Sequence, residues 1–243
     1  EEFEELVRRT HSQGLKVLID FIPNHLSREY DSAVKPFDDR NFYPGRIHDG
    51  DWTDTVKLNY GSHDTWEKMR DILMFWAAKG VDGFRCDMVE LVTVDFWEWC
   101  IPQIKKIYPD IIFIAEIYQP HNYHPYIRRG GFDYLYDKSG FYDTLRAISA
   151  GHTPASSLTS VWQGLGDFQP NMLNFLENHD EQRVASDFFI GDPRRSMAML
   201  YVSLLFNTAP FMIYFGQELG ERGMETEGQS GVDGRTTRDD FWS

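Results

Sequence analysis

The chain has 243 residues, of which 42% are hydrophobic, and its formal net charge at pH 7 is −14. This length can bury a substantial core, and no apolar run approaches the roughly 18 residues that a membrane-spanning helix needs. Because the negative charge would repel a phosphate backbone, the composition argues against nucleic acids and membranes as partners and favours a neutral or cationic ligand.

Amphipathic stretches with helix-capping residues alternate with short apolar runs. The first predicted helix stops at Gly14, and Asp64-Thr65-Trp66-Glu67 reads as a capping box that opens the second. Asp192-Pro193, a capping residue before a first-turn proline, opens the last helix. In chain order the pattern predicts helix 2–13, strand 16–20, helix 64–80, strand 82–86, helix 93–108, strand 111–115, strand 132–136, helical segments to about 168, strand 172–176, helix 192–207 and strand 211–215.

Strands that alternate with helices favour an α/β architecture in which a parallel sheet is covered by helices. Six strands do not close an eight-stranded barrel. Between His25 and Asp64 the alternation is interrupted by about forty residues rich in Asp, Tyr, Pro and Gly, which is typical of a functional loop or a small subdomain. The two cysteines, Cys86 and Cys100, are expected to be free thiols because Cys86 lies within a predicted buried strand.

Acids and histidines stand where apolar strands give way to loops. In a (β/α) barrel these strand ends converge on one face, where the chemistry is done. The blocks that show this pattern are Asp20-Phe21-Ile22-Pro23-Asn24-His25, Gly83-Phe84-Arg85-Cys86-Asp87, Ile114-Ala115-Glu116, Phe175-Leu176-Glu177-Asn178-His179-Asp180 and Tyr214-Phe215-Gly216-Gln217-Glu218.

In order and spacing, these blocks resemble the signature regions of the α-amylase family, glycoside hydrolase family 13. The block from Asp20 to His25 is similar to the first region, at the end of the third barrel strand, and the block ending at Asp87 is similar to the second. Glu116 and Asn178-His179-Asp180 match the third and fourth regions. Lys57-Leu58-Asn59 resembles the motif near the end of the inserted domain B, and the block from Tyr214 to Glu218 resembles the eighth strand.

The resemblance implies a TIM-type (β/α)8 barrel of which strands three to eight are present. Residues 1–25 and 61–243 would form the partial barrel, and residues 26–60 a short domain B-like insertion. The first two βα units are then expected to precede Glu1, so the absence of a targeting segment leaves the compartment open between cytoplasm, periplasm and exterior.

Retaining hydrolysis of a glycosidic bond needs a nucleophilic carboxylate and, about 5 Å away, a carboxylic acid that protonates the leaving oxygen. By resemblance, Asp87 is the nucleophile and Glu116 the acid and later the base, while Asp180 stabilises the oxocarbenium-like transition state. Arg85 precedes Asp87 by two residues on a strand, so the two side chains share a face and the guanidinium can orient the carboxylate.

Further residues are expected to bind substrate. The resemblance implies that His25 and His179 hydrogen-bond sugar hydroxyls. Asp20 either contacts substrate or supports Arg85, and Tyr118 is a candidate for stacking on a glucose ring or for plain packing. Three and four residues beyond the nucleophile, many relatives carry Lys-His, where the lysine contacts the aglycone side. Here Glu90 and Leu91 stand there, which leaves the acceptor-side preference open.

No cofactor is needed for this chemistry. The resemblance leaves room for a structural calcium, with Asn24 as a ligand alongside domain B carboxylates. The expected partner is an α-glucan oligosaccharide or polysaccharide, and the expected function is hydrolysis of α-1,4-glucosidic bonds in starch, glycogen or maltodextrins.

Three alternatives stay open. One is a maltosyl- or glucanotransferase with the same acids, and another is a non-catalytic relative that binds carbohydrate or serves a transporter. The third is a metal-dependent hydrolase that uses His25 and His179.

Overall fold

The computed structural model describes residues 1–223. They fall into two compact units: the first runs from Glu1 to Leu135, and the second begins at Tyr136. Each unit is described by itself. The part of the predicted barrel that follows residue 223 lies outside the described residues.

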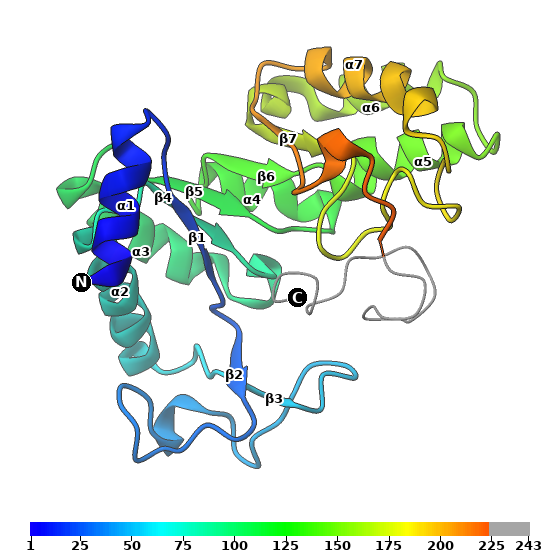
Figure 1. Ribbon diagram of the computed structural model, residues 1–243. Helices are drawn as coiled ribbons and strands as arrows, with labels where there is room; N and C mark the ends of the chain where they lie inside the picture. Colours follow the sequence, from blue (N-terminus) through cyan, green and yellow to red (C-terminus); the bar gives the residue numbers. More distant parts are fainter. Residues whose placement is uncertain (224–243) are drawn as a thin grey trace. The chain divides into compact units, whose positions relative to one another are not determined.

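The first unit contains four parallel strands and a separate antiparallel ribbon (Figure 1). Its helices are α1 (Glu2–Ser12), α2 (His63–Ala78), α3 (Val94–Ile107) and α4 (Tyr123–Arg128), with short 3-10 helices η1 (Asp39–Asn41), η2 (Val89–Leu91) and η3 (Pro120–Asn122). Its parallel strands are β1 (Leu18–Phe21), β4 (Gly83–Cys86), β5 (Ile112–Ala115) and β6 (Tyr134–Tyr136), which crosses the unit boundary. The ribbon consists of β2 (His25–Ser27) and β3 (Thr55–Lys57).

The parallel strands pair in the order β1, β4, β5, β6, with Leu18 opposite Gly83 and Gly83 opposite Ile112. This register aligns the carboxyl ends of neighbouring strands, so the loops after β4 and β5 start side by side. Buried aromatic rings from the strands and from α3 form the core. Phe84 and Phe113 lie 5.6 Å apart between ring centroids, and Trp97 lies 4.8 Å from Phe132.

The second unit has two parallel strands, β7 (Met172–Phe175) and β8 (Phe211–Met212). The end of β6 lies beside β7, since the amide of Asp137 donates to the carbonyl of Leu173. The helices are α5 (Asp143–Ser149), α6 (Ser157–Leu165) and α7 (Met197–Leu205), with a π-helix η4 (Lys138–Tyr142) and 3-10 helices η5 (Gly166–Asn171), η6 (Pro193–Ser196) and η7 (Gln217–Leu219). Its core includes Phe141, Leu145, Leu176 and Val184.

The structure confirms the predicted parallel α/β class and the six parallel strands, with local corrections. The last strand covers only Phe211–Met212 of the predicted 211–215, and the predicted last helix opens as the 3-10 helix η6 before α7. The ribbon of β2 and β3 lies in the stretch where no strand was predicted. The first strand begins at Leu18 rather than Lys16. Helix α2 begins at His63 after Ser62, so Asp64 is not its capping residue. The reason is that the Asp64 carboxylate pairs with Lys68 at 2.7 Å and accepts a hydrogen bond from Asn41 at 2.8 Å.

Both cysteines are free and buried, as expected. Burial raises the pKa of the Cys100 thiol, which keeps it protonated and inert at neutral pH. Among the helices of residues 1–223, none has both the length and the apolar character needed to cross a bilayer.

Gly83 of β4 lies opposite Ile112 of β5, with no room for a side chain. A Cβ atom at this position would lie 2.6 Å from Cγ1 and 2.7 Å from the carbonyl oxygen of Ile112. Because the carbonyl belongs to the paired strand, it cannot move aside. We expect Gly83→Ala to lower the free energy of unfolding by about 1–3 kcal/mol in urea denaturation.

Gly164 in α6 is the matched control, since a Cβ there would meet nothing within 4 Å. Gly164→Ala should leave stability unchanged or raise it by up to about 1 kcal/mol. Wild-type stability of Gly83→Ala would show that the strands do not approach this closely.

Candidate active site

Arg85 gathers three carboxylates at one edge of the first unit. Its guanidinium lies 3.0 Å from an oxygen of Asp87, 3.0 Å from an oxygen of Glu116 and 3.8 Å from an oxygen of Asp20. The Arg85 side chain is only 10% exposed. The expected pairing of Arg85 with Asp87 is therefore present, and Asp20 and Glu116 share the same cation.

Glu116 follows β5 directly, and its side chain is only 3% exposed. One carboxylate oxygen accepts a 2.6 Å hydrogen bond from the Tyr118 hydroxyl. The other accepts a 2.9 Å bond from the Met88 amide. With Arg85 as a further partner, Glu116 is fixed in one orientation, as a group that must exchange protons with a defined atom requires.

Asp87 stands at the first position after β4. Its amide donates to the carbonyl of Phe21 at 2.9 Å, which continues the pairing of β1 with β4 by one residue. Met88 then takes a left-handed conformation with φ of 41°. This turn, unfavourable for a side-chain-bearing residue, aims the Met88 amide at Glu116. The nucleophile candidate and the acid candidate are thus tied by backbone as well as by Arg85.

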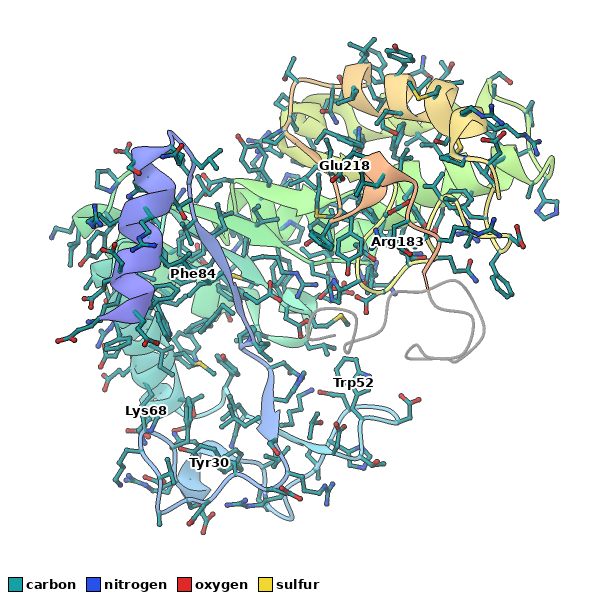
Figure 2. The ribbon with its side chains drawn as sticks, in the orientation of Figure 1. Tyr30, Trp52, Lys68, Phe84, Arg183 and Glu218 are labelled. Atoms are coloured by element: carbon teal, nitrogen blue, oxygen red, sulfur yellow. The ribbon has the colours of Figure 1, made fainter. Side chains whose placement is uncertain are left out.

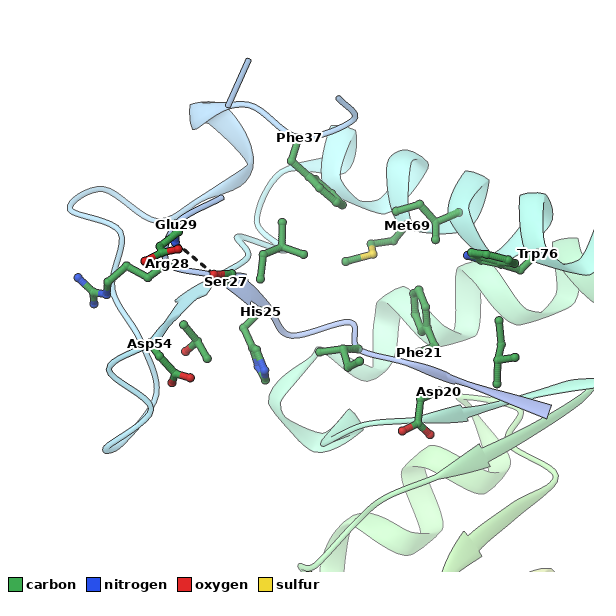
Figure 3. Close-up of a pocket in the computed structure, with 15 residues that line it drawn as sticks. Asp20, Phe21, His25, Ser27, Arg28, Glu29, Phe37, Asp54, Met69 and Trp76 are labelled. Carbon is green, nitrogen blue, oxygen red and sulfur yellow. Dashed lines mark hydrogen bonds between the residues drawn. The ribbon is translucent and has the colours of Figure 1, made fainter. Parts of the chain in front are cut away.

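Asp20 and His25 lie at the margin of a cavity of about 670 Å³. Figure 3 shows this cavity between β1, the ribbon and α2. Its walls are mostly apolar and include Phe21, Met69 and Trp76. The cavity does not include Asp87 or Glu116 among its lining residues, so it adjoins the carboxylate cluster rather than containing it.

The His25 ring packs against Trp52, with ring centroids 5.4 Å apart, and Trp52 projects from the turn before β3 (Figure 2). This pair belongs to the insertion that follows β1. An indole beside an imidazole offers an apolar face and a hydrogen-bonding edge, which suits a sugar ring with its hydroxyls.

The second unit carries Asn178, His179 and Asp180 after β7. The Asn178 side-chain oxygen accepts hydrogen bonds from the amides of Asp180 at 2.9 Å and Glu181 at 2.8 Å. His179 Nε2 lies 3.3 Å from a carboxylate oxygen of Asp180. Asn178 therefore shapes the turn that presents His179 and Asp180, and the gathering of Asp180 with Asp87 and Glu116 stays a prediction from the resemblance.

Glu177 makes structural contacts. Its carboxylate pairs with the buried Arg183 at 2.8 Å and accepts the amide of Val184 at 2.8 Å. Burial raises the pKa of Glu177 despite these partners. The Arg183 guanidinium in turn covers the ring of Tyr214, 4.4 Å from its centroid (Figure 2).

Sequence reasoning missed one carboxylate, Asp137, and the contacts of another, Glu90. Asp137 follows β6 directly and is fully buried. Burial raises its pKa to about 6, and the amides of Phe141 and Gly140 offset only part of the rise. The Glu90 carboxylate binds the loop after β5. The signal for Asp137 was available, because it is a polar residue at a strand end like the other acids.

At Asn24 the side-chain oxygen is buried and has no hydrogen-bond partner among the described residues, but the carboxylate beside it is already engaged and is not free for the calcium that the resemblance implies. The Asn24 amide nitrogen donates to Asp49 at 2.8 Å, and the Lys57 ammonium lies 2.6 Å from the other oxygen of Asp49. Burial raises the pKa of Asp49, but Lys57 and Asn24 outweigh burial and hold it below its usual value. An ammonium thus already supplies the positive charge. Nowhere in residues 1–223 do three or more His, Cys, Asp or Glu side chains form a group that could hold a metal ion.

The chain is similar to known carbohydrate-active proteins. A family model described as "Alpha amylase, catalytic domain" matches residues 47–243. Alpha-amylase 3 of Dictyoglomus thermophilum is 25% identical over 273 residues, which cover 93% of this chain and 52% of that protein. An alpha-1,4-glucan:maltose-1-phosphate maltosyltransferase of Cereibacter sphaeroides is 31% identical over 126 residues, which cover 49% of this chain and 21% of that protein.

Among solved structures, an alpha-amylase from Lactobacillus plantarum superposes with a TM-score of 0.78 at 26% identity, covering 97% of this chain and 57% of that one. The chain spans about half the length of the relatives that it matches from end to end. These similarities confirm the predicted fold class, a portion of a (β/α)8 barrel. Asp87, Glu116 and Asp180 lie within the matched range.

The raised pKa of Asp137 predicts a pH-dependent stability. The carboxyl has a pKa of about 6 when folded and about 3.9 when unfolded, so the folded state binds the proton more tightly. Proton binding by Asp137 therefore contributes fully to the free energy of unfolding below about pH 4, and this contribution is lost as the pH rises through about 6. Asp137→Asn removes this loss, so its free energy of unfolding should exceed that of the wild type at pH 7.5 by up to about 3 kcal/mol.

Urea denaturation at pH 4.5 and at pH 7.5 provides the measurement. The advantage of Asp137→Asn should shrink at the lower pH. If the free energies of unfolding of the variant and the wild type differed equally at both pH values, burial would not raise the pKa of Asp137.

Because the Lys57 ammonium already pairs with Asp49, we expect the stability of the protein not to depend on calcium. Addition of EDTA should leave the unfolding temperature of the wild type unchanged. Lys57→Ala leaves Asp49 and Asn24 without their cation and should cost about 1–3 kcal/mol. Differential scanning calorimetry with EDTA and with calcium measures both effects, and a lower unfolding temperature of the wild type in EDTA would contradict the prediction.

Proposed function

The chain belongs to the alpha-amylase family of glycoside hydrolases, and on this premise we propose that it cleaves α-1,4-glucosidic bonds of starch, glycogen or maltodextrins with retention at the anomeric carbon. The observation that carries the proposal is the cluster in which Arg85 contacts both Asp87 and Glu116 at 3.0 Å. The cluster supports the proposal because a double displacement needs two carboxyl groups that face one bond, and here both contact one cation at the ends of adjacent parallel strands.

Asp87 is proposed to attack the anomeric carbon and form the covalent glycosyl-enzyme. Its pairing with Arg85 at 3.0 Å orients the carboxylate for the attack. The Asp87 side chain is 22% exposed, so one oxygen remains within reach of a substrate entering from the strand ends.

Glu116 is proposed to protonate the departing glycosidic oxygen and then to take a proton from the incoming water. The Tyr118 hydroxyl and the Met88 amide hold its carboxylate during both steps. Tyr118, expected to bind sugar, thus gains a second proposed role as a support for the acid. Asp180 and His179 are proposed to contact the sugar at the reacting subsite, and His25 and Asp20 to contribute from the first unit.

A transglycosylase is the second candidate, and one observation favours it. The maltosyltransferase of Cereibacter sphaeroides is among the relatives with the higher identity. Both reactions share the glycosyl-enzyme and differ in whether water or a sugar hydroxyl accepts the glycosyl group. Incubation with maltotriose separates them, because a transferase forms products longer than the substrate.

We expect Asp87→Asn and Glu116→Gln each to lower kcat on maltodextrins by about 10²–10⁴-fold, since each removes a group that acts in the transition state. The measurement is reducing-sugar release, with anomer-resolved NMR of the first products. The wild type should release the α-anomer first.

Asp95→Asn and Glu98→Gln are matched controls, since both side chains lie on the surface of α3 and pair with Arg129. Neither should change kcat. Wild-type turnover by folded Asp87→Asn or Glu116→Gln, or initial release of the β-anomer, would refute the proposal.

A further inference from the structure

Glu90 makes more hydrogen bonds than a surface carboxylate needs. It lies in η2, three residues beyond Asp87. One of its oxygens accepts the amide of Tyr118 at 3.1 Å. The other accepts the amide of Gln119 at 3.2 Å and the side-chain amide of Asn122 at 2.9 Å. Each carboxylate oxygen is therefore engaged by the segment that follows β5.

The donors show what Glu90 does for that segment. The amides of Tyr118 and Gln119 are consecutive backbone groups in a loop, and a carboxylate is a stronger acceptor for them than a neutral oxygen. Asn122 ends η3 and adds a third attachment. Glu90 thus fixes the backbone of the loop between Glu116 and α4 against the loop that carries Asp87.

The Tyr118 side chain passes this constraint to the acid. Glu90 holds the Tyr118 backbone, and the Tyr118 hydroxyl donates to Glu116 at 2.6 Å. Met88, two residues before Glu90, donates its amide to the opposite oxygen of Glu116 at 2.9 Å. A single short segment, residues 87–90, therefore carries the nucleophile and supports the acid from both sides.

We propose that Glu90 is a positioning residue that sets the orientation of Glu116 toward the reacting bond through Tyr118. The proposal rests on the proposed function of Asp87 and Glu116. Glu90 acts by holding the loop, and it does not touch the substrate. Many relatives carry a lysine at this position, three residues beyond the nucleophile. The role of Glu90 differs from that of the lysine, because three hydrogen-bond donors of the loop after β5 already occupy the Glu90 carboxylate.

The test uses Glu90→Gln, Tyr118→Phe and the double variant in the natural protein. Glutamine keeps the size of the side chain but replaces one carboxylate oxygen by an NH₂ group, which would face an N–H donor of the loop after β5. Small displacements of a catalytic group are costly, so kcat of Glu90→Gln, per folded molecule, should fall about 10- to 100-fold while KM changes little. Glu98→Gln, the surface change on α3, is the matched control and should keep wild-type kcat.

The double variant separates positioning from plain structural support. If Glu90 acts through Tyr118, the two substitutions interrupt one chain of contacts, and their effects on kcat should not multiply. The kcat of the double variant should stay within about threefold of the kcat of the less active single variant. Should Glu90→Gln fail to fold, Glu90→Asp keeps both oxygens on a shorter side chain and carries the same comparison.

The outcomes are distinct. Suppose that the wild type is active. If Glu90→Gln then keeps wild-type kcat, or if the effects of the two substitutions multiply in the double variant, the role of Glu90 is overturned and the proposed function still stands. A wild type without activity on any α-glucan refutes the proposed function and this role together.

Discussion

The contacts of the buried Arg85 guanidinium are the interaction on which the candidate active site of the first unit depends. The guanidinium lies within 4 Å of Asp20, Asp87 and Glu116. Without this cation, the three carboxylates around it would repel one another. Because Glu116 is shielded from water, loss of Arg85 would leave its buried carboxylate without a cation, and breaking a buried pair in this way typically costs about 3–5 kcal/mol. The strand register that places Arg85 between its partners is thus also the condition for the chemistry.

Side-chain carboxylates and amides at the strand ends accept hydrogen bonds from loop backbone, and some of the same loops carry the residues of the proposed site. Loops leave peptide groups without the partners that strands provide, and buried peptide groups need partners. Glu116 binds the amide of Met88, Glu90 binds the amides of Tyr118 and Gln119, and Asn178 binds those of Asp180 and Glu181. The loops that present reactive groups are therefore rigid because polar side chains satisfy them. A site of this kind is preorganised by the same bonds that complete the fold.

The insertion after β1 combines a small apolar cluster, in which Tyr30 packs on Phe37 and Phe42, with polar contacts. Its two short strands bring Lys57 opposite His25, and Lys57 and Asn24 converge on Asp49. A second set of contacts, in which Asn41 donates to Asp64 and Thr65, ties the insertion to the start of α2. These contacts anchor His25 and its neighbour Trp52 next to β1, where an extended polar loop alone would be too flexible to present them.

The amino-acid sequence by itself determined the strands, the parallel class and the acids at the strand ends, because apolar runs, helix caps and turn residues act over a few neighbouring positions. It predicted the pairing of Arg85 with Asp87, since residues two apart on a strand share a face, while Asp87 and Glu116 became catalytic candidates through the family resemblance. Only the tertiary structure decided that Glu90 binds the loop after β5, that Tyr118 supports Glu116 within that loop, and that Lys57 neutralises Asp49. Glu90 and Tyr118 are 28 residues apart, and Asn24 and Asp49 are 25 apart. Such partners meet because strand register aligns two loops, and no local pattern records which polar side chain will then face which backbone amide.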